Sequence, residues 1–502
     1  MLITILVYLA AMVGIGAVLA KQNQTTDDFY LGGRTLGPLV TAMSAEASDM
    51  SSWLLMGLPG VAYLSGTADA AWTAIGLAIG TYVNWLVVAK RLRNYTHVCG
   101  NSTTLPLFFS NRYRDNKRIL SVIAALLIII FFVPYTASGF AACGKLFAKL
   151  FGMDYLPAML ISAIVIVAYT TLGGFLAAST TDFVQSIVMT IAIVVVFGFG
   201  ISKVGSFSAV MDNAKSMAGY FSLTHTHDVA TGTASPYSLL QIFSTLAWGL
   251  GYFGMPHVLL RFMAIGDANK LKLSRRVATV WVVISMAVSV FIGVIGNAMT
   301  KAGVLPTLKD PETIILVVAD LISKHGVLAT IIAGLILAGI LAATMSTADS
   351  QLLAASSSAS QNILKEVFMK DMSEKTGMLI ARITVLVIAL IGVFIARNPD
   401  SSVFQIVSFA WAGFGASFGP LVLMALFWKR STFQGALCGM VSGGVMVFVW
   451  KFLIRPMGGA LGIYELLPAF LLGLAVNVIV SLLTPAPSRE VQDEFDKVAS
   501  MK

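Results

Sequence analysis

Long apolar stretches, each about as long as a bilayer is thick, alternate with short polar connections along almost the whole chain. A transmembrane helix needs about 20 mostly apolar residues, and thirteen segments meet this requirement. They lie near residues 1–20, 37–66, 71–89, 119–142, 157–178, 183–201, 237–256, 277–299, 326–347, 378–396, 402–427, 434–453 and 462–484. The pattern therefore predicts an all-α polytopic membrane protein with thirteen transmembrane helices.

The second and seventh of these segments are interrupted by polar residues, glycines and prolines. In the second, SAEASDMSSWLLMGLPG places Glu46 and Asp49 inside an apolar run, and in the seventh, WGLGYFGMP combines three glycines with Pro256. An ionisable side chain at bilayer depth costs about 2.5–3.5 kcal/mol on insertion scales. Helices that unwind at this depth expose backbone carbonyls to a protected cavity. We predict that both helices are discontinuous and line such a cavity.

The two interruptions lie five spans apart, which is typical of transporters built from two inverted halves. Spans two to eleven are then a five-plus-five inverted-repeat core, and the other spans are peripheral. The predicted units are 1–36 (peripheral helix and cytoplasmic loop), 37–201 (first repeat), 202–427 (external loop and second repeat), 428–485 (helices twelve and thirteen) and 486–502 (short cytoplasmic tail).

Composition and charge agree with a membrane protein and indicate its orientation. Hydrophobic residues make up 57% of the chain and charged residues only 11%. If the N-terminus is outside, 22 of the 33 Lys and Arg residues fall in cytoplasmic segments. The positive-inside rule therefore predicts an external N-terminus and a cytoplasmic C-terminus. Basic cytoplasmic loops account for the net charge of +9, so no nucleic-acid partner is expected.

The chain shows no pattern that indicates an enzyme or a bound cofactor. Cys99, Cys143 and Cys438 lie far apart in or near apolar surroundings, which favours neither a disulfide framework nor a metal site. No arrangement of nucleophile, base and oxyanion donors stands out. The expected partners are a small solute, a coupling ion and the lipid bilayer, with no obligatory protein partner.

The ninth span ends in a segment rich in hydroxyl groups, LAATMSTADSQLLAASSS. Ser346 and Thr347 follow Ala343 by about one helical turn, which brings one backbone carbonyl close to two hydroxyl oxygens. Together with two carbonyls from an unwound segment they would give five oxygens, the ligands that a hard cation such as sodium prefers. The alternative is that these small residues only pack at helix contacts and donate hydrogen bonds to the backbone of their own helix.

Four acids border or interrupt apolar segments and are candidates for ion coupling. They are Glu46, Asp49, Asp182 and Asp349. Asp182 lies where the fifth span meets the sixth, so a solvated turn is an equal alternative for it. A buried acid without a partner binds a proton rather than carrying a charge, so proton coupling stays open.

Four long motifs resemble those of the sodium/solute symporter family, and most of all its proline branch. They are SAEASDMSSWLLMGLPG, GGFLAASTTDFVQ, WGLGYFGMPHVLLRFM and AATMSTADSQLLAASS, and the resemblance covers nearly the whole chain. It implies sodium-coupled import of L-proline across a bacterial cytoplasmic membrane by alternating access. Glu46 and Asp349 depart from the pattern, and the second departure suggests an additional sodium or proton site with Ser350.

The resemblance also implies roles for particular residues. The sodium ligands would be the carbonyls of Ala47, Met50 and Ala343 with the hydroxyls of Ser346 and Thr347. The substrate positions would be Ser51, Trp53, Tyr135, Trp248, Tyr252 and Pro256. The ion pathway and coupling positions would be Asp49, Asp182 and Arg34, to which the residue-based argument adds Asp349.

Two alternatives stay open from the sequence. The first keeps the fold and changes the solute or the ion, to another small amino acid or organic solute, or to a proton. The second is a membrane sensor that binds a solute without moving it, and the tail PAPSREVQDEFDKVASMK is too short to hold an output domain for such a sensor.

Overall fold

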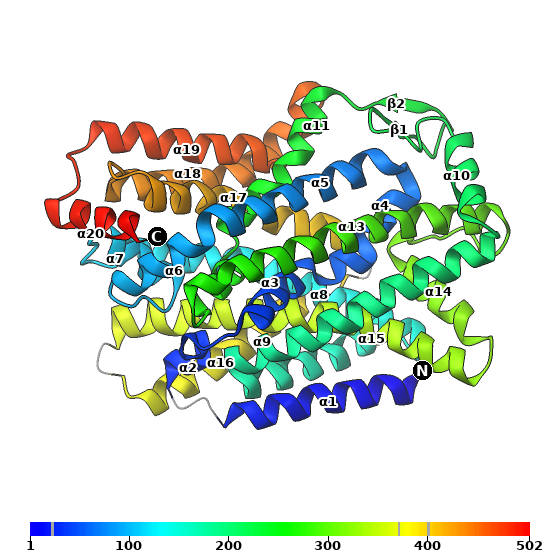
Figure 1. Ribbon diagram of the computed structural model, residues 1–502, viewed down its shortest axis with the longest axis horizontal. Coiled ribbons are helices and arrows are strands. Elements are labelled where there is room, and N and C mark those ends of the chain that lie inside the picture. The colour runs from blue at the N-terminus through cyan, green and yellow to red at the C-terminus, as the bar shows by residue number, and fades with distance from the viewer. Residues whose placement is uncertain (22–24, 370–371, 399–401, 502) are drawn as a thin grey trace.

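The computed structural model describes residues 1–21, 25–369, 372–398 and 402–501 as a bundle of helices that run roughly along one axis (Figure 1). Within this described part, ten helices are long and apolar enough to cross a membrane. The N-terminus and the C-terminus lie at opposite ends of the bundle (Figure 1). The prediction of a predominantly helical, multi-span membrane protein is confirmed, and the only departure in the described residues is one short hairpin.

The helices and strands follow the apolar segments closely. The helices are α1 (Leu2–Ala20), α2 (Thr26–Leu31), α3 (Pro38–Ser52), α4 (Leu58–Ser65), α5 (Thr67–Val83), α6 (Ala89–Val98), α7 (Leu105–Arg112), α8 (Ile119–Phe151), α9 (Tyr155–Val204), α10 (Phe207–Ser216), α11 (Leu239–Leu246), α12 (Pro256–Ala264), α13 (Leu271–Lys301), α14 (Ile314–Ser323), α15 (Val327–Ser357), α16 (Glu374–Ala396), α17 (Val403–Phe427), α18 (Phe433–Val449), α19 (Leu466–Leu483) and α20 (Arg489–Ser500). The strands β1 (His225–His227) and β2 (Ala234–Pro236) pair antiparallel, with Thr226 opposite Ser235.

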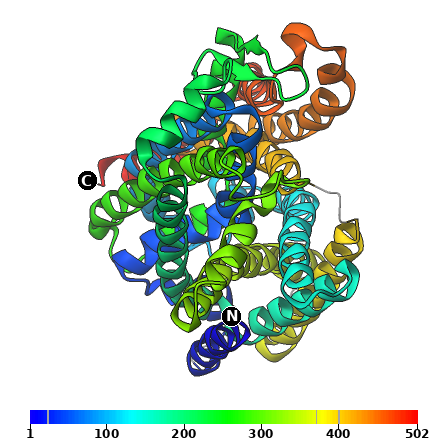
Figure 2. The same ribbon diagram turned by 90° about the vertical axis from the view of Figure 1, so that its right-hand side faces the viewer.

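The centre of the bundle is α15, which packs against α9, α8 and α3. Every residue from Ile336 to Ser357 on α15 is buried, as expected for a helix that other helices surround on all sides. In contrast, α1 lies at the periphery of the bundle (Figure 2). The hydroxyl-rich segment of the ninth predicted span therefore lies in the protein interior rather than against lipid.

The fifth and sixth predicted spans meet at a different residue from the one that the sequence suggested. The hydropathy pattern placed a connection near residues 179–182, but helix α9 is regular there and its backbone departs from helical geometry at Gly174 (φ 61°, ψ −173°). Glycine adopts a positive φ without the steric cost that a Cβ atom brings. The connection is therefore eight residues earlier than Asp182, and Asp182 lies within a helix.

Helix α5 approaches the second interrupted segment, Ala247–Gly254, through glycines. A Cβ atom added at Gly80 would lie 2.5 Å from the Cα atom of Gly249 and 2.7 Å from its carbonyl carbon. Asn84, one turn further along, donates its Nδ2 to the carbonyl oxygen of Tyr252 (3.1 Å). The small residues of α5 thus let its backbone contact the unwound segment, and Asn84 satisfies one of the carbonyls that unwinding frees.

We expect the substitution Gly80→Ala to lower the thermal unfolding midpoint of the detergent-purified protein. The methyl group cannot fit without moving backbone atoms, and overpacking of this kind costs about 1–3 kcal/mol. Gly14→Ala is the matched control, because a Cβ atom at Gly14 meets nothing within 4 Å. An unchanged midpoint for Gly80→Ala would show that the two segments are not packed this closely.

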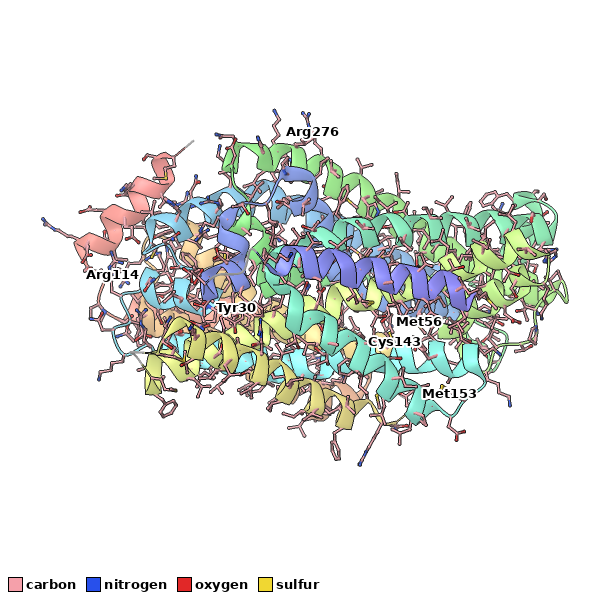
Figure 3. All side chains as sticks on the ribbon, turned by 90° about the horizontal axis from the view of Figure 1, so that it is seen from below. Tyr30, Met56, Arg114, Cys143, Met153 and Arg276 are labelled. Carbon is pink, nitrogen blue, oxygen red and sulfur yellow. The ribbon has the colours of Figure 1, made fainter. Side chains whose placement is uncertain are left out.

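The C-terminal helix α20 docks on the same end of the bundle as α6 and α7 (Figure 1). Phe495 and Val498 are buried, and Arg114 donates to Glu490 and Glu494, each at 2.9 Å. Figure 3 shows Arg114 at this end, beside α20. The tail after the last long helix is thus an amphipathic helix held by apolar contacts and ion pairs.

Candidate functional site

The first interrupted helix is broken at Ser51. Helix α3 ends there because Ser51 has φ 49° and ψ −171°, a conformation that non-glycine residues rarely adopt and that costs about 1–3 kcal/mol. The Ser51 Oγ accepts the N–H of Trp53 (3.0 Å), which supports the break locally. A π-helical turn, Trp53–Gly57, then leads into α4. The break places Asp49 and Trp53 at the centre of the bundle, where both are buried.

Four of the five predicted sodium ligands come together between α3 and α15. The hydroxyl of Ser346 lies 2.9 Å from the carbonyl oxygen of Ala47 and 3.2 Å from that of Ala343. The hydroxyl of Thr347 lies 3.1 Å from the carbonyl oxygen of Ala343. These atoms are two carbonyl and two hydroxyl oxygens, which suits a hard cation.

The fifth predicted ligand, the carbonyl of Met50, accepts the backbone N–H of Trp53 in this conformation. Its second lone pair is free to bind a cation, since a carbonyl oxygen has two. Met50 is also one of the residues that line the central cavity described below.

The second interrupted helix changes conformation over a longer stretch. After α11 the chain forms a 3-10 segment, Ala247–Gly254, and then an extended residue, Met255 (φ −78°, ψ 107°), before Pro256 begins α12. Proline suits this first helical position because it lacks the N–H that would have no partner there. Trp248 and Tyr252 project from the 3-10 segment and are buried.

A small cavity of about 10 Å³ lies between the two broken helices. This volume holds about one water molecule, so the cavity is closed in this conformation. Its walls include five of the predicted residues and three that the sequence analysis did not name. The lining residues are Asp49, Met50, Trp53, Tyr135 and Trp248, together with Leu77, Val407 and Trp411. Ser51, Tyr252 and Pro256 are not among the lining residues in the described part of the chain.

Hydrogen bonds converge on Asp49 from two tyrosines. Tyr252 donates its hydroxyl to Asp49 Oδ2 (2.6 Å), and Tyr135 donates to the backbone carbonyl of Asp49 (3.1 Å). Tyr252 also packs edge-on against Trp411, with ring centroids 5.1 Å apart. The aromatic residues therefore form an apolar enclosure around one buried acid, and Asp49 fixes the orientation of the tyrosines.

Asp182 forms a buried ion pair with Arg261. Arg261 Nη2 lies 3.1 Å from Asp182 Oδ2, and the two side chains are 1% and 0% exposed. Ser44 of α3 donates to the same carboxylate oxygen (2.6 Å). The alternative of a solvated turn for Asp182 is therefore wrong. Arg261 is one of the 22 Lys and Arg residues that the charge count assigns to cytoplasmic segments, but its side chain is buried inside the bundle.

The ion pair is joined to the predicted sodium ligands through α15. Arg261 donates to the hydroxyl of Ser350, which in turn donates to the carbonyl of Ser346 (2.9 Å). Ser350 is also within hydrogen-bond distance of Asp349 Oδ1 (3.1 Å). Two hydrogen bonds, both made by the hydroxyl of Ser350, therefore connect the backbone carbonyl of Ser346 to the guanidinium of Arg261.

Glu46 is enclosed on the opposite side of α3. Its Oε1 accepts the indole N–H of Trp85 (2.8 Å), and in the described part of the chain its Oε2 has no hydrogen-bond partner. The same is true of Asp349 Oδ2. Both acids that depart from the family pattern are therefore buried and only partly satisfied.

Arg34 lies away from the central cavity, at the point where the first broken helix begins and the second one ends. It donates to the carbonyls of Met263 (2.6 Å) and Ser102 (2.8 Å). Next to it, the N–H of Leu36 donates to the carbonyl of Ala264 (3.2 Å). Arg34 thus ties the start of the first broken helix to the end of the second.

The residues that the sequence analysis missed carry different signals. Trp411 is an aromatic residue in an apolar helix, a pattern that core packing also produces. Arg261 had a usable signal, since it is a charged residue five positions after Pro256 in an otherwise apolar run. A charge within such a segment is expected to face a partner inside the protein.

Comparison with known proteins identifies the family. Residues 29–443 match the sodium:solute symporter family. The chain belongs to this family. The sodium/proline symporter of Salmonella typhimurium is 41% identical over 502 residues, covering 99% of this chain and 96% of the relative. The osmoregulated proline transporter of Bacillus subtilis is 40% identical over 489 residues, covering 97% and 96%. The resemblance deduced from the four motifs is confirmed, and this symporter is a transporter rather than an enzyme.

Solved structures show the same fold. A substrate-bound, outward-open sodium-coupled sialic acid symporter aligns with a TM-score of 0.79 at 19% identity, covering 97% of this chain and 98% of the other. A nucleobase-cation-symport-1 family transporter in a closed conformation aligns with a TM-score of 0.54 at 14% identity, covering 94% and 98%. At these identities the likeness concerns the fold alone.

Proposed function

We propose that this symporter imports L-proline together with sodium across a bacterial cytoplasmic membrane, by alternating access. The observation that carries the proposal is the meeting of the Ala47 and Ala343 carbonyls with the Ser346 and Thr347 hydroxyls between the broken helix α3 and α15. Relatives named sodium/proline symporter, 41% identical over nearly the full chain, support the choice of ion and solute.

We also propose thirteen spans with a five-plus-five inverted repeat, at the unit boundaries that the sequence predicts. Ten long apolar helices account for ten spans, and the shorter apolar helix Tyr155–Ala168 supports another. The two interrupted helices, α3–α4 and α11–α12, supply the remaining two. Both breaks lie at the central cavity, as the repeat requires.

The proposed orientation places the N-terminus outside and the C-terminus in the cytoplasm. It is supported by the charge distribution and by the positions of the two termini at opposite ends (Figure 1). Lys370 and Lys502, which the charge count assigns to the cytoplasm, lie outside the described residues. The end that carries the β1–β2 hairpin is then external, and the end that carries α20 is cytoplasmic.

The aromatic enclosure suits a small apolar ring. The rings of Trp53 and Trp248 lie 5.6 Å apart between centroids, and aromatic faces of this kind can cover a pyrrolidine. Exposed backbone groups at the two helix breaks can meet the ammonium and carboxylate groups. Because the cavity is only about 10 Å³ in this conformation, the aromatic side chains must move apart when the solute binds.

Sodium coupling supplies enough free energy for accumulation. A sodium ion that crosses about 100 mV releases about 2.3 kcal/mol, and a tenfold gradient adds about 1.4 kcal/mol. Their sum supports accumulation of a net-neutral zwitterion by several hundredfold.

A proton is the second candidate for the coupling ion. The observation that favours it is that Glu46 and Asp349 each have one buried carboxyl oxygen without a hydrogen-bond partner in the described part of the chain. Burying an unpaired charge is costly, and a carboxyl group avoids that cost by binding a proton. Asp349 and Ser350 are also the residues that we propose for any additional sodium ion.

The test is uptake of radiolabelled L-proline into proteoliposomes that contain the purified symporter. We expect uptake with an inward sodium gradient and only background uptake when potassium replaces sodium. Uptake driven by an inward proton gradient without sodium would assign the coupling to a proton instead. No proline uptake by correctly folded protein under either gradient would reject the substrate assignment, and a competition panel of small amino acids would then follow.

A further inference from the structure

A cavity of about 890 Å³ lies at the end of the bundle that carries α7 (Figure 1). We call it the cytoplasmic pocket, a name that rests on the proposed orientation. Its walls come from the loops before α7 and α8, the first turn of α7, and the π-helical segment Ser358–Phe368 that continues α15. It shares no lining residue with the central cavity. Its volume is near the upper end of the range for small-molecule sites, about 300–1,000 Å³.

The charged residues that border the pocket leave it net positive. They are the cations Lys117, Arg118 and Lys365 and the acids Asp27 and Glu366. Glu366 Oε2 lies 4.0 Å from Arg118 Nε, and Glu366 also interacts electrostatically with Lys365. One carboxylate is thus shared by two cations, and in the described part of the chain Lys117 has no ion-pair partner. A positive charge that the protein does not balance in this way favours an anion.

Two side-chain amides in the pocket wall have buried atoms without hydrogen-bond partners. Asn362 is 1% exposed, and its Nδ2 donates to the hydroxyl of Thr104 (3.0 Å). Within the described residues, the Oδ1 of Asn362 and the Nε2 of Gln361 have no partner. Nearly all buried polar groups in proteins are hydrogen-bonded. One free acceptor and one free donor beside a cavity therefore indicate a polar ligand.

The pocket is connected to the residue that ties the two broken helices together. Arg34 Nε donates to Asn101 Oδ1 (3.1 Å), and Asn101 borders the pocket. Another wall, the segment Ser358–Phe368, continues α15, which carries the proposed sodium ligands Ser346 and Thr347. A ligand that bridges these walls holds them in the conformation in which the central cavity is closed.

We propose that the cytoplasmic pocket binds a phosphate group, and that its occupancy slows transport by stabilising this closed conformation. Lys117, Arg118 and Lys365 bind the phosphate oxygens through charge-assisted hydrogen bonds. The amides of Gln361 and Asn362 bind polar atoms next to the phosphate. The first turn of α7 adds backbone N–H groups, which favour an anion. A ligand that binds one conformation better than the others shifts the population toward it.

Two sources can supply the phosphate group. One is a soluble phosphorylated metabolite, and the other is the headgroup of an anionic phospholipid. Val367 borders the pocket and is 44% exposed, and Phe368 beside it is 72% exposed. Exposed apolar side chains at this position are compatible with lipid contact, so the experiment includes an arm for each source.

The first arm measures binding of radiolabelled AMP to the full-length symporter by equilibrium dialysis. The protein is held in phosphatidylcholine nanodiscs without sodium or L-proline. We expect one saturable site with a Kd below about 1 mM. Inorganic phosphate should displace AMP, and adenosine, which lacks the phosphate, should not.

A pair of lysine substitutions tests whether the pocket is the binding site. Lys117→Gln with Lys365→Gln should weaken AMP binding at least about tenfold, because it removes two charge-assisted contacts. The matched control is Lys272→Gln with Arg276→Gln. It removes the same charge from exposed residues at the start of α13, which do not line the pocket. AMP binding to the control should equal that to the native protein.

The second arm counts phosphatidylglycerol molecules that stay bound to the detergent-purified protein, by native mass spectrometry. If a lipid headgroup occupies the pocket, the native protein retains a phosphatidylglycerol that inorganic phosphate displaces and that the double lysine variant lacks. If the ligand is soluble, the retained lipid is the same in both proteins. The proposal is rejected if AMP, inorganic phosphate and phosphatidylglycerol all bind the native protein and the double lysine variant equally, or do not bind.

Uptake of L-proline tests the effect on transport, and this readout alone rests on the proposed function. AMP enclosed in the proteoliposomes, or phosphatidylglycerol in their membrane if the second arm assigns the lipid, should slow sodium-driven uptake at least about threefold. The double lysine variant should transport at the same rate with and without the ligand. Binding without any change in uptake would overturn the regulatory role. If L-proline is not transported at all, the proposed function fails, and the binding measurements still decide whether the pocket holds a phosphate group.

Discussion

Replacing both Ser346 and Thr347 by alanine is expected to lower sodium-dependent proline uptake at least about 100-fold. The substitution removes two of the oxygens that meet between α3 and α15. A bond from a neutral group to a charge contributes about 1.5–3 kcal/mol, and each 1.4 kcal/mol is a factor of ten in affinity. The measurement is the initial rate of uptake as a function of sodium concentration in proteoliposomes.

Thr344→Ala is the matched control for this double substitution. Thr344 is a buried hydroxyl on the same helix, but it donates to the carbonyl of Ile340 (2.9 Å) and not to the proposed site. We expect its sodium dependence to match that of the native symporter. If Ser346→Ala with Thr347→Ala also leaves the sodium dependence unchanged, the cation binds elsewhere, and Asp182 and Asp349 become the residues to examine.

The two helix breaks could be predicted because their physical cause is local. Serines, an acid, glycines and prolines within a bilayer-length apolar run are incompatible with an uninterrupted helix exposed to lipid. The structure places the breaks at Ser51 and around Met255, inside the segments that the sequence indicates. The position of the break at Gly174 was less accessible, because small residues such as those of GGFLAAS are tolerated inside helices as well as at their ends.

The partners of the buried charges could not be predicted, because they depend on which helices meet. Asp182 and Arg261 are 79 residues apart in the sequence, and no local pattern links them. The sequence shows that each is a charge beside an apolar segment, but only the packing of α9, α12 and α15 shows that they neutralise each other. The same holds for Trp411, which reaches the central cavity only because α17 packs against the segment Ala247–Gly254.

Arg261→Gln is expected to destabilise the symporter strongly and to abolish transport. Without the guanidinium, the buried carboxylate of Asp182 loses the cation that it pairs with. Removing one partner of a buried ion pair costs about 3–5 kcal/mol, because the other charge is left uncompensated. The measurement is the thermal unfolding midpoint of the purified protein, followed by uptake in proteoliposomes for the variants that remain folded.

The double variant Arg261→Gln with Asp182→Asn distinguishes charge balance from shape. It removes both charges, with Asn matching Asp in size and Gln shorter than Arg, so much of the lost stability should return because no uncompensated charge stays buried. We expect the midpoint to recover while uptake stays low, since Asp182 also accepts the hydroxyl of Ser44 on the broken helix α3. If the double variant is no more stable than Arg261→Gln alone, the two side chains do not act as a pair, and the contacts of Arg261 with Ser350 and Ser44 account for its importance.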